Sequence, residues 1–294
     1  LMEAIEETGA QMAQMGRDEI AETGERLPDV VPPVDKLTVI SSMEHMRTLL
    51  MHTGDASYCT KLTARSLFDG SESEAENNFQ NNDLHKSEDG SQNNDSHKAE
   101  NSSMEIDSHK SGNSSMEIDF HKPENGSNEI NSNSTNLVFP EGILNEDFYL
   151  MIHMLQKIDK LVVIPGQYYH VFYRTGSNSR KKAEDKDFFP RVFTDIVDNS
   201  AIAEKIVDNT WPELKEIAIR FGLYQRLDYM LHIPISKMTA DNTYYRGVVK
   251  YLRAHIGDTI TNKYLTKKNK IYLLLLSIAP RTVRKAHAKS KGWD

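Results

Sequence analysis

Cysteine and long apolar runs are both scarce in this chain of 294 residues. Cys59 is the only cysteine, so no disulfide can form within the chain, and no base near it in sequence activates it, which favours a buried structural role. The longest apolar run, residues 271–276, is far shorter than the roughly 18 residues of a spanning helix. No secretory leader is recognisable either. We therefore expect a cytoplasmic protein that does not span a membrane.

Basic residues are scarce in one segment, residues 71–137, which has 14 acidic side chains against four lysines. Its net charge of −10 exceeds the −8 of the whole chain, which leaves about +2 for the rest. A twelve-residue unit recurs here, over residues 81–92, 93–104, 105–116 and 117–128. The position that could be buried in each unit is Leu84, Ser96, Ser108 or Phe120, so no continuous core can form. The composition predicts a disordered insert.

Two other interpretations of the insert stay open. Each unit contains Asp-x-His, and carboxylate and imidazole groups can bind metal ions, although a lysine follows every histidine and flexible ligands lose entropy on binding. Asn-x-Ser/Thr sequons also occur, but an Asn/Ser-rich composition produces them by chance, and glycosylation needs a secretory route. Sequons occur at Asn101, Asn113, Asn125 and Asn133.

The stretch from Phe139 to Ser177 organises the rest of the chain. It begins with a Phe-Pro-Glu-Gly loop, and Glu146-Asp147 then open a helix with apolar residues at helical spacing. Two strands, residues 161–165 and 168–174, and a Gly-Ser turn follow. Acids at a helix start are favoured by the helix dipole, so the pair could serve only as a cap.

The order of these pieces resembles the second half of a bacterial family 2 glycosyltransferase domain. A Cys-Thr-Lys-Leu strand followed by Leu-Phe, at residues 59–68, is similar to the segment of that family that lines the cleft between donor and acceptor. The resemblance implies an A-type nucleotide-diphospho-sugar transferase fold of class α/β. It divides the chain into residues 1–70 and 138–180 of the transferase domain, the insert at 71–137, and a helical C-terminal region at 181–294.

The resemblance also implies a chemistry and a set of site residues. A sugar would move from a nucleotide diphosphate to a hydroxyl with inversion, in the synthesis of a cell-surface polysaccharide or glycan. Asp147 is the expected catalytic base, with Glu146 as the alternative, and Lys61 and Asn145 are expected on the acceptor side of the cleft. For Lys61, an edge lysine on a strand is equally expected. His170, in the second strand, is expected to pack rather than to bind metal.

Cofactors are also implied, namely a nucleotide-diphosphate sugar and a divalent metal, Mg or Mn. Family members open with a strand, a donor-binding loop and an Asp-x-Asp motif, and these residues contain no counterpart. We therefore expect metal and donor ligands to lie outside this chain.

Local signals predict the remaining elements. Residues 1–15 are predicted to form a helix that ends near Gly16, and prolines exclude a continuous helix or central strand over residues 17–40. Helix starts are predicted at Ser41, Thr210, Asp241, Thr266 and Pro280, the first two as capping boxes. Ile256 is assigned to the helix that follows Asp241.

The C-terminal segment from Arg246 onward has 12 basic residues and two aspartates, a net charge of +10. A solvated face is the simplest interpretation, and attraction to anionic lipid head groups at the inner membrane face is the functional one. Nucleic-acid binding ranks last because no recognition motif is present, so we expect no nucleic-acid partner. The alternative to a glycosyltransferase is a non-catalytic helical interaction protein with an acidic spacer.

Overall fold

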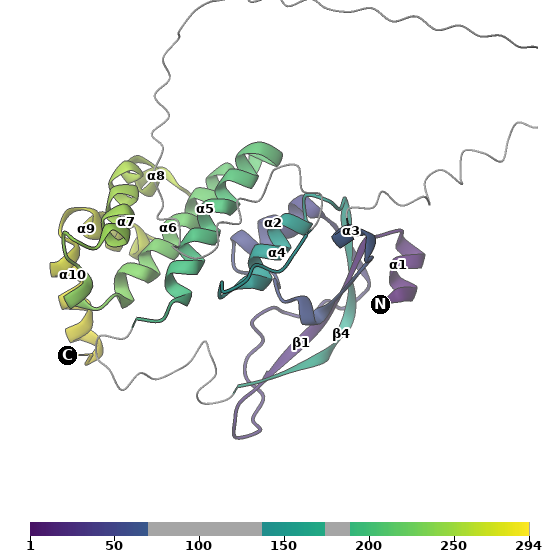
Figure 1. Cartoon of the computed structure of the whole chain (residues 1–294). Helices are drawn as coiled ribbons and strands as arrows, with labels where there is room; N and C mark the ends of the chain where they lie inside the picture. The colour runs from purple at the N-terminus through teal and green to yellow at the C-terminus, as the bar shows by residue number, and fades with distance from the viewer. Residues whose placement is uncertain (70–136, 174–188, 294) are drawn as a thin grey trace, which may run out of the picture. The chain divides into compact units, whose positions relative to one another are not determined.

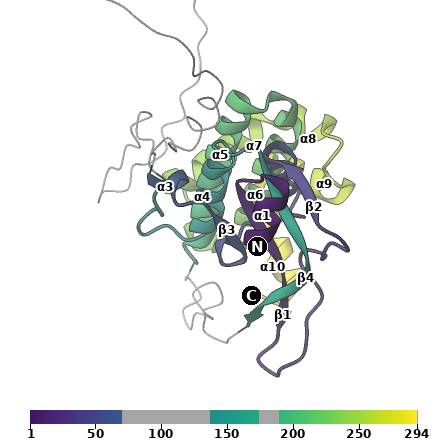
Figure 2. The ribbon, with the colours of Figure 1, turned by 90° about the vertical axis from the view of Figure 1, so that its right-hand side faces the viewer.

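A four-stranded mixed sheet lies at the centre of the part that the computed structural model describes, residues 1–69, 137–173 and 189–293. The strands are β1 (Met12–Ile20), β2 (Thr38–Ser41), β3 (Lys61–Thr63) and β4 (Lys160–Phe172). Their order is β2-β4-β1-β3, with β1 and β4 parallel and the two edge strands antiparallel to their neighbours (Figures 1 and 2). The acidic repeat, the Gly-Ser turn and the basic run that follows it lie outside the described residues.

The predicted N-terminal helix is too long. Helix α1 (Met2–Thr8) ends at Gly9, whose φ of 62° is the left-handed conformation that glycine adopts most easily at a helix end. The chain then enters β1, so Gly16 lies inside a strand. A Cβ on Gly16 would approach the carbonyl oxygen of Gly166 to 2.5 Å, so glycine is required here by the close approach of β1 and β4.

Strand β4 merges the two strands that the sequence predicts. Pro165 and Gly166 interrupt its pairing, and the register with β1 shifts between Gln14 and Gly16 and again after Gly16. A proline lacks the N–H that a regular ladder needs, so the strand continues through an irregularity instead of ending. Pro165 therefore marks a bulge, and the prediction that it ends a strand is wrong.

Alternation along the central strands directs side chains to two faces of the sheet. Met12 and Leu161 join a buried cluster with helices α2 (Ser42–Leu50) and α4 (Glu146–Met154). Their neighbours Ala13 and Val162 join a second cluster with α1 on the opposite face. The middle of the sheet is therefore covered on both sides.

Helices make up most of the remaining described chain. They are α3 (Ser66–Asp69), α5 (Val192–Thr210), α6 (Lys215–His232), α7 (Thr243–Ala254), α8 (Ile256–Thr261), α9 (Lys267–Ile278) and α10 (Pro280–Lys291). Single turns of 3-10 helix lie at η1 (Tyr58–Thr60), η2 (Pro212–Leu214) and η3 (Ile235–Lys237). None of the described helices is both long and apolar enough to cross a membrane.

Several predicted helix starts are confirmed. The Ser41 and Thr266 side chains accept hydrogen bonds from the backbone N–H groups of Glu44 and Asn269, and Pro280 is the first residue of α10. Thr210 is instead the last residue of α5, where no capping box forms.

Two further assignments in the C-terminal helices are wrong. The cap of α7 is Asn242 rather than Asp241, and its side chain accepts from the N–H of Tyr245. Ile256 belongs to α8, because α7 ends two residues earlier.

The sheet and the C-terminal helices share one hydrophobic cluster, which runs from Met12 on β1 to Phe221 on α6. His52, just after α2, joins the two parts through polar contacts as well. Arg220 donates to the carbonyl of Leu50 at 2.9 Å and to His52 Nδ1 at 3.0 Å, and the Gln225 amide lies 2.9 Å from His52 Nε2. A second cluster lies among the helices alone.

Candidate functional site

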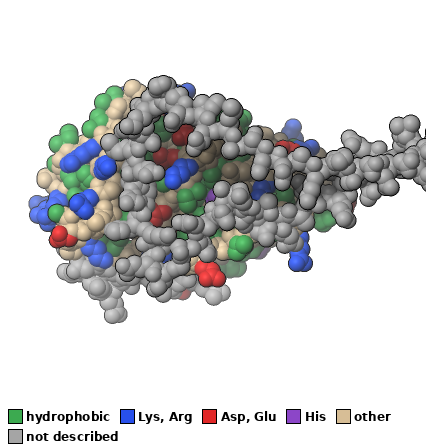
Figure 3. All heavy atoms as spheres, turned by 45° about the horizontal axis from the view of Figure 1, so that its top comes forward, with side chains coloured by type: hydrophobic (Ala, Val, Ile, Leu, Met, Phe, Trp, Pro, Cys, Tyr) green, Lys and Arg blue, Asp and Glu red, His purple; other side chains and the backbone are tan. Residues whose placement is uncertain are grey.

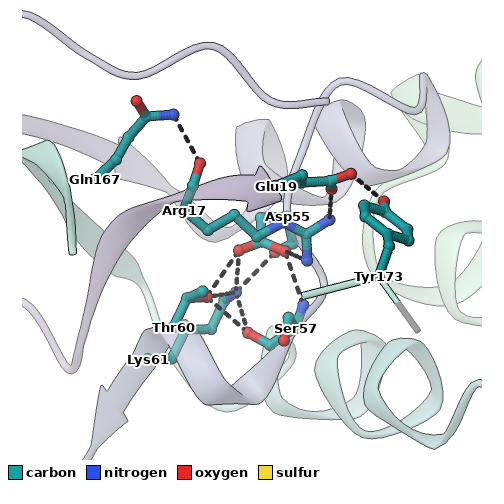
Figure 4. A network of polar contacts seen from close by, with 8 residues as sticks. All are labelled: Arg17, Glu19, Asp55, Ser57, Thr60, Lys61, Gln167 and Tyr173. Carbon is teal, nitrogen blue, oxygen red and sulfur yellow. Dashed lines mark hydrogen bonds and ion pairs between the residues drawn. The ribbon is translucent and has the colours of Figure 1, made fainter. Parts of the chain in front are cut away.

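A network of charged side chains lies where the loop after α2 meets β1 (Figure 4). The buried Asp55 carboxylate is its centre. It accepts from the Thr60 hydroxyl at 2.7 Å and from the Ser57 N–H at 3.0 Å, and it pairs with Arg17 Nη1 at 3.2 Å. The side chain of Lys61 is fully buried, with Nζ 3.8 Å from Asp55 Oδ2.

Hydrogen bonds to two backbone carbonyl oxygens hold the Lys61 side chain in place. Its ammonium donates to the carbonyls of Asp55 at 2.8 Å and Ser57 at 2.7 Å, so it closes the loop that leads into β3. Burial lowers the pKa of Lys61 to about 8, although the Asp55 carboxylate opposes this shift. Burial would raise the pKa of Asp55, but Lys61 and Arg17 together hold it below its usual value. The loop is therefore organised around a buried ion pair.

Arg17 extends the network along the sheet (Figure 4). It pairs with Glu19 at 3.4 Å, and Glu19 in turn accepts from the Tyr173 hydroxyl at the end of β4. The Gln167 amide donates to the Arg17 carbonyl at 2.7 Å. The parallel pairing of β1 and β4 thus brings together groups that lie about 150 residues apart.

The start of α4 is held in place by α5. The Leu144 N–H donates to Asp195 Oδ2 at 2.8 Å, and the Asn199 amide donates to the Asn145 carbonyl at 3.2 Å. Asn145 takes a left-handed φ of 69°, and its side chain makes no capping bond. Glu146 and Asp147 follow in the first turn of α4. Two side chains of α5 therefore hold the turn that carries the acidic pair, one through a backbone N–H and the other through a backbone carbonyl.

Asp147 is half-buried and lies against the loop that Lys61 organises. The backbone N–H of Tyr58 and the charge of Lys61 both act to lower its pKa. Burial and the neighbouring Glu146 carboxylate outweigh both and raise the pKa of Asp147 above its usual value. Glu146 itself is exposed. The pair therefore consists of one solvated acid and one desolvated acid.

The structure brings together three of the four residues that the sequence singles out at one site. Asp147 and Lys61 interact electrostatically, and Glu146 adjoins Asp147. Asn145 contributes its carbonyl to the contact with α5 rather than a side-chain contact to the pair. Arg17 and Asp55 could not be found from the sequence, because neither belongs to a local pattern and only the tertiary fold brings the loop of Asp55 against β1.

Two single residues differ from expectation. Cys59 is exposed, so a buried role is wrong. His170 is also exposed, and its Nδ1 lies 2.6 Å from Asp18 Oδ1 on the paired strand. Cys59 lies on η1 and His170 on β4. Each element has only one buried face at that position, and both side chains lie on the other face.

A cavity of about 160 Å³ adjoins the network, because Arg17 and Asp55 also line it. Gln14 and His45 line it as well, and their buried Oε1 and Nε2 atoms have no hydrogen-bond partner among the described residues. Burial lowers the pKa of His45 to about 3, so this imidazole is neutral. Arg17 and Asp55 of the network are therefore the charged side chains that line this cavity.

Comparisons of the chain with protein families, with curated proteins and with solved structures find no match. The site must therefore be interpreted from its side chains. No group of three or more His, Cys, Asp or Glu side chains is arranged to hold a metal ion within residues 1–69, 137–173 and 189–293.

The chemistry that the site can support follows from Asp147. A half-buried carboxylate with a raised pKa accepts a proton more readily than a solvated one. The nearest cation, Lys61, is already bound to oxygens of this chain and is not open to a substrate anion. The arrangement therefore suits proton abstraction from a neutral group, such as a hydroxyl.

Proposed function

We propose that this chain carries the acceptor side of an inverting family 2 glycosyltransferase, which moves a sugar from a nucleotide diphosphate to a hydroxyl in polysaccharide or glycan synthesis. The observation that carries the proposal is the packing of the Tyr58 ring against the Phe139 ring, with centroids 5.7 Å apart, beside the Asp147 carboxylate. It joins the two segments whose motifs resemble that family, although the insert separates them in sequence. The mixed α/β sheet around them is compatible with the proposed fold.

The proposed chemistry assigns the proton to Asp147. A hydroxyl is a weak nucleophile near neutral pH, so a base must take its proton as attack proceeds. The acceptor oxygen bonds to the anomeric carbon on the face opposite the diphosphate. The bond from that carbon to the diphosphate oxygen breaks, and the diphosphate leaves with the electron pair. The hydroxyl proton ends on the Asp147 carboxylate.

The other residues hold this base in position. Glu146 raises the pKa of Asp147 by charge repulsion, which makes the carboxylate a stronger base. The Tyr58 backbone N–H and the Lys61 ammonium partly offset this rise, and Lys61 fixes the loop beside Asp147. The proposal therefore gives Lys61 a positioning role in the acceptor cleft, through the loop, and not a direct contact with the sugar.

Donor binding and metal binding are not assigned to the described residues. A departing diphosphate needs its charge neutralised, and the resemblance implies a divalent metal for this purpose. The described residues offer no cluster of ligands that fits such an ion. We therefore assign to this part of the chain the acceptor, its deprotonation and the positioning of the base.

Asp147→Asn tests the proposal most directly, in the natural polypeptide that contains these 294 residues. The change removes the proton acceptor and keeps the shape, so we expect turnover to fall by roughly 10²–10⁴-fold with little change in donor binding. The measurement is release of nucleoside diphosphate from a panel of nucleotide sugars with Mn²⁺ and oligosaccharide acceptors.

Glu146→Gln is the matched comparison, and Glu213→Gln, an exposed acid on η2, is the control. We expect Glu146→Gln to cost less than Asp147→Asn and Glu213→Gln to cost nothing. If both acidic variants keep normal turnover, the pair only caps α4, and the non-catalytic interaction protein becomes the better hypothesis. A larger loss for Glu146→Gln would reverse the roles of the two acids.

A further inference from the structure

Helix α9 has apolar side chains in the core and also on a side that stays exposed in the described part of the chain. Leu273 and Leu276 are buried in the helical core. Ile271, Leu275 and Ile278 remain 58%, 47% and 74% exposed, respectively. Their spacing of four and then three residues places them on one side of the helix. A row of exposed aliphatic side chains on one side of a helix is a candidate contact surface.

Basic residues continue the same row. Lys267 and Lys268 lie four and three residues before Ile271, so they share its side of the helix, and both are exposed. The first turn of α9 contains no acidic residue. Lysines at a helix start oppose the helix dipole, so helix stability does not explain them. We call the five residues Lys267, Lys268, Ile271, Leu275 and Ile278 the α9 face.

Helix α8 adds aliphatic surface beside the α9 face. Ile256 and Ile260 are 37% and 56% exposed. The Lys270 ammonium donates to the Ile260 carbonyl at 2.7 Å, which ties α8 to the basic first turn of α9. Figure 3 shows Lys and Arg side chains next to hydrophobic ones at the left of the view, over the C-terminal helices. Aliphatic and basic groups are therefore mixed on this surface.

We propose that the α9 face docks on an anionic lipid surface, with α9 lying in the plane of the interface. Exposed aliphatic side chains on one side of a helix can enter the acyl boundary, while the lysines reach lipid phosphates. The proposal is independent of the glycosyltransferase proposal, because it uses no residue of that site.

Charge and side-chain type argue against other occupants. Two copies of this chain would bring two basic surfaces together, and like charges oppose such a contact. Single-stranded nucleic acid is bound by aromatic platforms and basic grooves, and the apolar residues of the α9 face are all aliphatic. A bilayer with anionic head groups satisfies both the aliphatic row and the lysines.

Vesicle co-sedimentation of the full chain tests the proposal. The probes are vesicles of phosphatidylcholine with 30% phosphatidylglycerol, at low and at high salt, and vesicles of phosphatidylcholine alone. We expect binding to the anionic vesicles that weakens at high salt, and little binding to the neutral ones. No binding to anionic vesicles, or equal binding to both kinds, would overturn the proposal.

Variants then assign the binding to the α9 face. Lys267→Gln with Lys268→Gln should weaken partitioning roughly 25-fold, because each basic residue near an anionic surface contributes a factor of about five. Ile271→Ser with Ile278→Ser should weaken it about ten-fold through lost apolar contact. All four side chains are exposed, so we expect the variants to fold, and circular dichroism checks this.

Matched controls lie outside this surface. Lys36→Gln with Lys205→Gln removes the same charge, and Val30→Ser with Val39→Ser removes exposed aliphatic groups elsewhere. We expect less than two-fold change for both pairs. Equal losses in the controls would show that binding depends only on total charge or general hydrophobicity, which contradicts the proposal. Self-association that the Ile271→Ser and Ile278→Ser pair abolishes, with vesicle binding unchanged, would identify a second copy as the occupant instead.

Discussion

Two buried cations, Arg226 in the helices and Lys61 beside the sheet, organise two polar networks with different surroundings. Arg226 Nη1 bonds to Ser200 Oγ at 3.2 Å and to the Gly222 carbonyl at 2.9 Å, and the guanidinium lies 3.4 Å from the centroid of the Tyr251 ring. Glu204 accepts from both Arg226 and the Tyr251 hydroxyl. This network joins helices α5, α6 and α7 to one another.

Lys61 is enclosed in a similar way, but its network ends beside a solvent-accessible acid. Asp147 adjoins it as a half-exposed carboxylate with a raised pKa. The buried Tyr58 Oη and Arg17 Nε have no hydrogen-bond partner among the described residues. A buried cation therefore does not by itself mark a functional site. Under the proposed function, the accessible acid beside Lys61 is what distinguishes the two networks.

The largest effect on stability should come from breaking the helical network. Arg226→Met removes one partner of a buried pair and leaves Glu204 without its cation, so we expect a loss of about 3–5 kcal/mol in the free energy of unfolding. Urea denaturation followed by circular dichroism measures it.

Lys61→Met is the matched change beside the sheet. Arg17 still pairs with Asp55 in this variant, but the carbonyls of Asp55 and Ser57 and the Thr60 hydroxyl oxygen lose their donor. We expect a loss of about 1–3 kcal/mol. A loss as large as that of Arg226→Met would mean that the two networks are equally structural.

A second difference between the regions concerns histidine and pH. Burial and the Arg220 guanidinium lower the pKa of His52 to about 4, whereas a hydrogen bond to Asp228 raises the pKa of His232 on α6. Below pH 6.5 His52 is protonated in the unfolded chain but stays neutral in the folded chain. The free energy of unfolding therefore falls as the pH drops toward 4. His232 has the opposite sign, because its stabilisation is fully present below pH 6.5 and is lost as the pH rises.

Glutamine variants separate the two histidines. His52→Gln should reduce the loss of stability between pH 7.5 and pH 5 by up to about 1 kcal/mol relative to the unchanged chain, because solvent screens this partly exposed imidazole. His232→Gln should increase that loss. Denaturation at both pH values measures each variant, and any constant cost of the substitution cancels in the difference. Parallel pH profiles for His52→Gln and the unchanged chain would contradict the assignment.

The smallest effect, and one of opposite sign, is expected at Asp147. Its ionised form is disfavoured by burial and by Glu146, so Asp147→Asn should leave the free energy of unfolding unchanged or raise it by up to about 0.5 kcal/mol. Asp195→Asn is the comparison, because this buried acid accepts the Leu144 N–H and pairs with Arg191, and we expect a loss of about 1–2 kcal/mol. Thermal melts of both variants test the contrast, and a destabilised Asp147→Asn would assign this acid to structure.

Local chemistry explains which predictions succeeded. Ser41 and Thr266 cap helices through bonds to N–H groups three residues away, and Pro280 fits the first turn of a helix by its own fixed φ. Thr210 carries the same signal, but Trp211 and Pro212 end one helix and begin a 3-10 turn there, so the packing of α5 on α6 decides the boundary.

The candidate site was predictable only in part, for the same reason. The acidic pair, Glu146 and Asp147, stands out because it opens a helix after a recognisable loop. Arg17 gave no such signal. Its partner Asp55 lies in a separate loop, and a one-residue change in the register of β1 would turn the guanidinium to the other face.

The sequence by itself determined where several helices begin, that the repeat lacks a periodic apolar position, and that an acidic pair opens α4. These properties depend on residues a few positions apart. The tertiary structure alone decided that Gly16 belongs to a strand, that Cys59 is exposed, and that Asp147 is desolvated beside the Lys61 loop. Each of these depends on which distant segment packs against the residue, and burial and pKa are set by that neighbour.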